Sequence, residues 1–133
     1  MQVKANELLN ELAHFTGDLE RYRAGLSRSV IYTPGVRHVA ERAGAYWLID
    51  AIVSHVNSRK FYRAVVKDAR IGSMHFWKLT VKDSTAKLEA RADDGEKPFI
   101  RQNIEYTDFP LDSIDIWAAF DGKNWTLYLP SEH

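Results

Sequence analysis

The stretch YTPGVRHVAERAGAYWLIDAIVSHV, residues 32–56, combines the longest helical spacing in the chain with its densest apolar content. Thr33 followed by Pro34 is typical of a helix start, because threonine caps helix N-termini and proline fits the first helical position. On a continuous helix the apolar residues would form two stripes on nearly opposite sides, with the change at Gly44. The first stripe holds Val36, Val39, Ala40, Ala43 and Trp47, and the second holds Ala45, Leu48, Ile49, Ile52 and Val56.

Two arrangements of residues 32–56 fit this change of side. The chain could form one helix that is buried all round, or two helices that meet at Gly44. We predict the two helices, because glycine weakens a helix interior by about 1 kcal/mol relative to alanine. Each half then needs its own packing partner.

Helices are also predicted on either side of this stretch. Asn6 can cap a helix over about 7–15, and Asn57-Ser58 separates residues 32–56 from a helix over about 59–69. Residues 18–31 have no clean period, so we expect a loop with a short helical turn or strand.

From Met74 onward the apolar period changes to two, which is typical of strands with one buried face. There are five such segments, and three of their four connections, at 83–84, 93–96 and 121–124, are hairpin sequences. The predicted fold class is α+β, with N-terminal helices packed on one face of a five-stranded antiparallel meander sheet. We expect a single domain over 1–133, with its helical part at about 5–70 and its sheet at about 74–129.

The composition is that of an ordinary globular protein, with 133 residues, 45% hydrophobic and 27% charged. The absence of cysteine excludes disulfides, thiolate zinc sites and cysteine nucleophiles. Residues 1–12 lack the apolar core of a secretion signal, and no apolar run approaches the ~18 residues of a membrane span. We therefore expect a cytoplasmic protein without a membrane partner.

The clearest candidate contact surface is a basic stripe along the last predicted helix. It consists of Arg59, Lys60, Arg63, Lys67 and Arg70. These cations could engage an acidic protein surface or the phosphates of a nucleic acid. Alternatively they form a solvated helix face whose aliphatic stems cover apolar neighbours.

A second candidate surface lies on the outer face of the predicted sheet, where Trp117 and Tyr128 stand near several cations. If both rings are exposed, they could form a contact hot spot for a protein partner or for self-association as a homodimer. Aromatic rings among cations could also stack bases, although ordinary cross-strand ion pairs explain the same pattern.

One candidate pocket combines Tyr32, Tyr46, Asp50 and Tyr106. Asp50 lies near the first apolar stripe, so it could be buried with a raised pKa and act in acid–base chemistry, or it could pair with an arginine. No metal site is predicted, because His38 and Glu41 lack a further ligand and the HExxH motif is absent. Phosphate-loop, dinucleotide and serine-hydrolase motifs are absent as well, and no cofactor is expected.

Four phrases together resemble a family of small bacterial, phage and plasmid proteins that share a domain of unknown function. They are YTPGVRHVAERAGAYWLIDAI at 32–52, FWKLTV at 76–81, YTDFPL at 106–111 and the closing LYLPSEH. The resemblance covers about 12–133. The chain departs from the family pattern at Pro34, where aspartate is frequent, and in its extra basic segment 57–70. The resemblance implies no activity and no catalytic residues, but an accessory or host-defence-countering role fits members on mobile elements.

These observations favour a non-catalytic accessory protein that binds an acidic surface of another protein, such as an inhibitor or adaptor of anti-CRISPR type encoded by a mobile element. The first alternative is a nucleic-acid-binding protein that uses the basic helix. The second is a small enzyme with a pocket centred on Asp50.

Overall fold

Gly44 divides residues 32–56 into two helices in the computed structural model, which describes residues 4–16, 20–24 and 29–133. Helix α2 spans Pro34–Arg42 and helix α3 spans Tyr46–Val56. Gly44 has φ of +61°, a left-handed conformation that glycine adopts without the steric cost of a side chain. Both predicted apolar stripes are buried apart from Trp47, which is half-buried. The prediction of two helices is confirmed.

The flanking helices also form, with shifted ends. Helix α1 spans Ala5–Leu12, so it begins before Asn6 and ends three residues before the predicted end at residue 15. Helix α4 spans Arg59–Lys67 and is followed by the short 3-10 helix η1, Ala69–Gly72. A second short helix, η2, covers Pro130–Glu132.

The sheet has seven strands rather than the predicted five, and it is mixed rather than antiparallel. The five predicted strands are present and pair antiparallel with one another, while two additional strands precede α2. The strand order is β1-β2-β7-β6-β3-β4-β5. The strands are β1 Tyr22–Arg23, β2 Val30–Tyr32, β3 Met74–Lys82, β4 Thr85–Arg91, β5 Ile100–Ile104, β6 Ser113–Phe120 and β7 Trp125–Tyr128.

The strand order is not a meander, because β6 pairs with β3 instead of β5. The connection between β5 and β6 carries the YTDFPL sequence, and its Thr107, Phe109 and Leu111 are buried. Burial of these side chains holds the connection against the core while it returns the chain to the other edge of β3. Sequence periodicity describes each strand separately, so it did not show this order.

The mixed character of the sheet comes from β2, which pairs parallel with β7. Two of its three residues, Val30 and Ile31, lie within the segment 18–31, which has no clean period. A strand this short is specified by its partner more than by its own pattern, and the backbone N–H of Trp125 donates to Ser29 O at 2.6 Å beside it. The helical and sheet parts are therefore not fully segregated along the chain.

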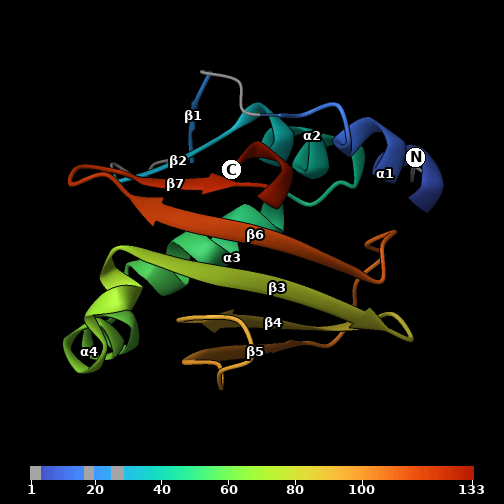
Figure 1. Cartoon of the computed structure of the whole chain (residues 1–133). Helices are drawn as coiled ribbons and strands as arrows, with labels where there is room; N and C mark the ends of the chain where they lie inside the picture. The colour runs from blue at the N-terminus through green and yellow to red at the C-terminus, as the bar shows by residue number, and fades with distance from the viewer. Residues whose placement is uncertain (1–3, 17–19, 25–28) are drawn as a thin grey trace.

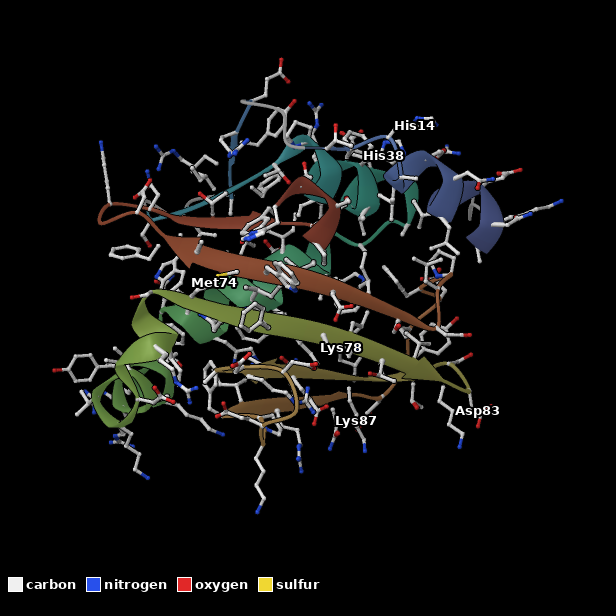
Figure 2. All side chains as sticks on the ribbon, in the orientation of Figure 1. His14, His38, Met74, Lys78, Asp83 and Lys87 are labelled. Atoms are coloured by element: carbon white, nitrogen blue, oxygen red, sulfur yellow. The ribbon has the colours of Figure 1, made fainter. Side chains whose placement is uncertain are left out.

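The helices cover one face of the sheet, and the other face is turned to solvent. Figure 1 shows α3 behind β3 and β6, with α1 and α2 at one end of the layer and α4 at the other. The side chains of β3 and β4 alternate between the core and the outer face as predicted. Figure 2 shows Lys78 and Lys87 on the outer face. Among the described residues no helix is long and apolar enough to cross a membrane.

The C-terminal Glu132 ties η2 to the start of α2. Its carboxylate accepts hydrogen bonds from the Thr33 hydroxyl at 2.6 Å, Gly35 N–H at 3.2 Å and Leu129 N–H at 2.9 Å. Thr33 also caps α2 as predicted, since its hydroxyl accepts from Val36 N–H at 3.3 Å. A carboxylate at a helix N-terminus satisfies free N–H groups and complements the helix dipole.

Candidate functional site

A groove of about 710 Å³ lies between α4 and the loop that joins β4 to β5. Its lining is mainly apolar, with Ala64 and Ile71 on the helical side and Ala92 and Phe99 on the loop side. Tyr62 and Val66 of α4 extend this apolar surface outward, and they are 70% and 69% exposed. Large exposed apolar side chains beside a groove are typical of a contact surface.

Helix α4 is placed by its cap and by one buried ring. The Ser58 hydroxyl accepts a hydrogen bond from Phe61 N–H at 3.2 Å and donates one to His55 O at 2.6 Å. One side chain therefore binds both the last turn of α3 and the first turn of α4. Phe61 is the buried residue of α4, and it packs against Phe99 and Trp125. Ala64 and Val65 are partly buried against the core, and the remaining residues of the helix are exposed.

Four cations stand around the groove, and the described part of the chain offers none of them an acidic partner. Lys60, Arg63 and Lys67 of α4 line it together with Lys97 of the loop. These side chains are exposed, and none forms an ion pair with any residue that the structure describes. Arg59 is exposed on the same helix but does not line the groove. The predicted stripe thus becomes a cationic rim around an apolar floor.

Arg70, the fifth predicted cation, forms ion pairs within the chain. Its guanidinium donates to Asp68 at 2.7 Å and to Glu96 at 2.9 Å, so its charge is already paired. Hydrogen bonds from Arg70 also hold the pKa of Asp68 below its ordinary value. Because Glu96 belongs to the β4–β5 loop and Arg70 to η1, the Arg70–Glu96 ion pair connects the two walls of the groove.

We predict that Arg70→Met loosens the loop without unfolding the protein. The Phe99 N–H donates to Ala90 O at 2.8 Å at the base of the loop, so its amide hydrogen exchange reports the change. Exchange at Phe99 should become several-fold faster, while exchange in β6 stays the same. Arg59→Met is the matched control, since Arg59 makes no such ion pair with the described residues. Equal exchange at Phe99 in both variants would contradict this role.

The second predicted surface is only partly exposed. Tyr128 is buried, and its hydroxyl lies 2.9 Å from His133 Nδ1, while Trp117 is half-buried. The two rings pack edge to face with centroids 6.1 Å apart, and Phe76 packs on the other side of Trp117 at 5.3 Å. The condition that both rings are exposed is not met by Tyr128, on which the His133 ring stacks.

The four residues of the candidate pocket around Asp50 differ in burial and are not all enclosed together. Asp50 is exposed rather than buried, and it does not line the α4 groove. Tyr32 is buried, which raises its pKa, and the nearby Asp50 charge adds to this shift. Tyr46 is exposed and donates to Glu41 at 3.2 Å. Tyr106 is 72% exposed in the loop after β5.

Sequence reasoning missed the loop residues that complete the groove. Glu96, Lys97 and Phe99 lie about 30 residues after α4, and no local pattern indicates that they meet it. The only signal was the hairpin sequence at 93–96. No group of three or more His, Asp or Glu side chains that could hold a metal occurs within residues 4–16, 20–24 and 29–133.

A family model covers nearly the whole chain, over residues 6–133, and carries the description of a family of unknown function, DUF6876. The chain belongs to this family. The match confirms the resemblance to a domain of unknown function, and it spans both walls of the groove. A comparison with curated proteins finds no significant match.

One solved structure is similar, a crystal structure of a protein of unknown function from Enterococcus faecalis. The identity is 18% and the TM-score is 0.46, over 84% of this chain and 95% of the other.

Proposed function

We propose that the protein is a non-catalytic binding module whose α4 groove takes an acidic, apolar segment of a partner protein. The observation that carries the proposal is the combination of an apolar floor with four cations that lack acidic partners among the described residues. Apolar contacts supply most of the affinity of such a segment, and flanking carboxylates select it through complementary charge. An inhibitor or adaptor acts by occupying a partner in this way.

Nucleic acid fits the groove less well, although the same cations could contact phosphates. The floor is formed by Ala64, Ile71 and Phe99, and the carboxylates of Asp68 and Glu96 lie beside it. Phosphate-binding surfaces depend on cations that follow the backbone, and acidic groups among them weaken binding. The enzyme alternative has less support, because Asp50 is exposed and lines neither this groove nor the hollow beside Lys78 and Trp117.

Displayed random peptides can test the proposal without a known partner. Peptides selected on the wild-type protein should combine Leu, Phe or Trp with Asp or Glu. In fluorescence anisotropy, Lys60→Glu with Arg63→Glu and Lys67→Glu should weaken the selected peptide by at least about tenfold, roughly 1.4 kcal/mol. Tyr62→Ser with Val66→Ser should weaken it as well, because both side chains extend the apolar surface.

A second triple variant with the same charge change is the matched control. Lys82→Glu with Lys87→Glu and Lys123→Glu alters exposed lysines outside the groove and should bind the peptide normally. Equal loss in both triple variants, or none in the groove variant, would refute the groove as the binding site. A steep logarithmic dependence of DNA or RNA binding on salt, lost in the groove variant, would favour the nucleic-acid alternative instead.

A further inference from the structure

We propose that a second hollow, on the outer face of the sheet, binds a guanidinium-bearing ligand. The hollow has a volume of about 810 Å³, and polar and apolar groups both line it. The hollow lies on the sheet face opposite α3, the face on which Figure 2 shows Lys78. It shares no lining residue with the α4 groove. Its size is that of sites for small organic ligands.

The register of the sheet builds one wall from aromatic rings. Phe76 of β3 stands directly opposite Trp117 of β6, and their centroids are 5.3 Å apart in an edge-to-face contact. Tyr128 of β7 lies opposite Trp117 on its far side and supports that ring. The tryptophan is therefore held in a defined position, and it lines the hollow with a minor part of its surface exposed.

The next row of the sheet alternates in charge. Asp115 lies opposite Lys78, and Lys78 lies opposite Glu89 on β4. The Lys78–Asp115 pair is loose at 3.7 Å with both side chains 46% exposed, so a ligand cation can compete for the Asp115 carboxylate. Glu89 is held by Arg91 and Arg101, each at 3.1 Å.

The β4–β5 loop closes one side of the hollow with Asp93, Asp94 and Gly95. Neither aspartate forms an ion pair with a residue that the structure describes. The charged residues of the lining are four acids and two cations, Lys78 and Arg91, both of which are already paired. The hollow therefore offers an excess of negative charge beside an aromatic face.

These two features select the ligand chemistry. The face of an indole ring attracts cations, and a planar guanidinium both stacks on it and bonds a carboxylate with two parallel N–H groups. A phosphate or carboxylate ligand would meet the unpaired aspartates and be repelled. The ligand class is therefore an organic cation with a guanidinium group, either free or on an arginine side chain.

The inference is tested by NMR titration of the full chain with Nα-acetyl-arginine amide. A neutral control of the same shape is Nα-acetyl-citrulline amide. The arginine amide should shift the Trp117 indole N–H and the Asp94 amide saturably, with a Kd of about 1 mM, as expected for one small group. Agmatine and the peptide Gly-Arg-Gly, titrated in parallel, show whether a free cation or a polypeptide side chain is held more tightly.

Two variants and one control assign the binding to the hollow. Trp117→Leu and Asp93→Asn with Asp94→Asn should each weaken the arginine amide several-fold. The matched control is Asp83→Asn with Asp108→Asn, which removes two exposed acids outside the hollow and should bind normally. Equal shifts with the citrulline amide, equal affinity in all variants, or no saturable shift would overturn the proposal. The α4 triple variant should retain this binding, which separates the result from the proposed function.

Discussion

Acidification from pH 6.5 to about 4 is expected to lower the free energy of unfolding by on the order of 3 kcal/mol through one side chain, His75. His75 is 0% exposed, and burial lowers its pKa from 6.5 to about 4. The rings of Phe61, Trp77, Phe99 and Trp125 surround it at centroid distances of 4.8 to 5.7 Å. Its Nδ1 lies 3.2 Å from Ile71 O, while Nε2 has no partner among the described residues.

The sign of this effect follows from where the proton binds. Between pH 6.5 and about 4 the unfolded chain protonates His75, whereas the folded chain keeps it neutral. The unfolded state therefore binds more protons, so stability is fully present above the unfolded pKa and falls as the pH decreases. Below about pH 4 the folded state takes up the proton too, and this loss levels off.

Urea denaturation at about pH 7 and about pH 5 measures the effect, and the expected difference from His75 is about 2 kcal/mol. The control is His75→Phe, which keeps a ring among the four aromatic neighbours but cannot be protonated. Three carboxylates have lowered pKa values: Glu11, ordinarily 4.5, and Asp68 and Asp121, ordinarily 3.8. Their contributions to the free energy of unfolding are lost mainly below those ordinary values, so they change little between about pH 7 and about pH 5. An equal pH dependence in wild type and His75→Phe would show that His75 is not responsible.

Gly35→Ala should destabilise the fold by about 2 kcal/mol, although glycine to alanine in a helix ordinarily stabilises. A Cβ at this position would lie 2.6 Å from Glu132 Oε1 and 2.8 Å from Leu129 Cδ1. The substitution therefore displaces the Glu132 carboxylate and the end of the Leu129 side chain, and it weakens the three hydrogen bonds to Glu132. Thermal and urea unfolding of the single variant give the first measurement.

A double-mutant cycle with Glu132→Ala distinguishes this cause from a general helix effect. Glu132→Ala alone should also destabilise, since it leaves Thr33 and two backbone N–H groups without their acceptor. With the carboxylate absent, Gly35→Ala should cost clearly less than it does in the wild type. Gly44→Ala is the control, because nothing lies within 4 Å of its added Cβ and its cost at φ of +61° should not depend on Glu132. Additive costs for Gly35 and Glu132 would contradict the contact.

Much of the candidate groove could be predicted, but only on one side. The cations of α4 follow from helical spacing, and the structure leaves Lys60, Arg63 and Lys67 facing the groove. The opposite wall could not be predicted, because Phe99 and Lys97 reach α4 through strand pairing and the Arg70–Glu96 ion pair. In the folded chain Arg70 pairs with Asp68 and Glu96, a contact between distant segments that the helical spacing of α4 does not indicate.

The sequence by itself determined the elements of this protein and their buried sides. Periods of 3.6 and 2 residues, the Thr33-Pro34 start and the glycine at position 44 are local properties, so the helices on both sides of Gly44 and five strands were predicted. Only the tertiary structure decided the strand order, the parallel β2–β7 pair and the exposure of Asp50. These three features depend on contacts between residues far apart in the sequence. The free energy of such contacts depends on core packing and on the closure of long loops, so no single segment of the sequence determines it.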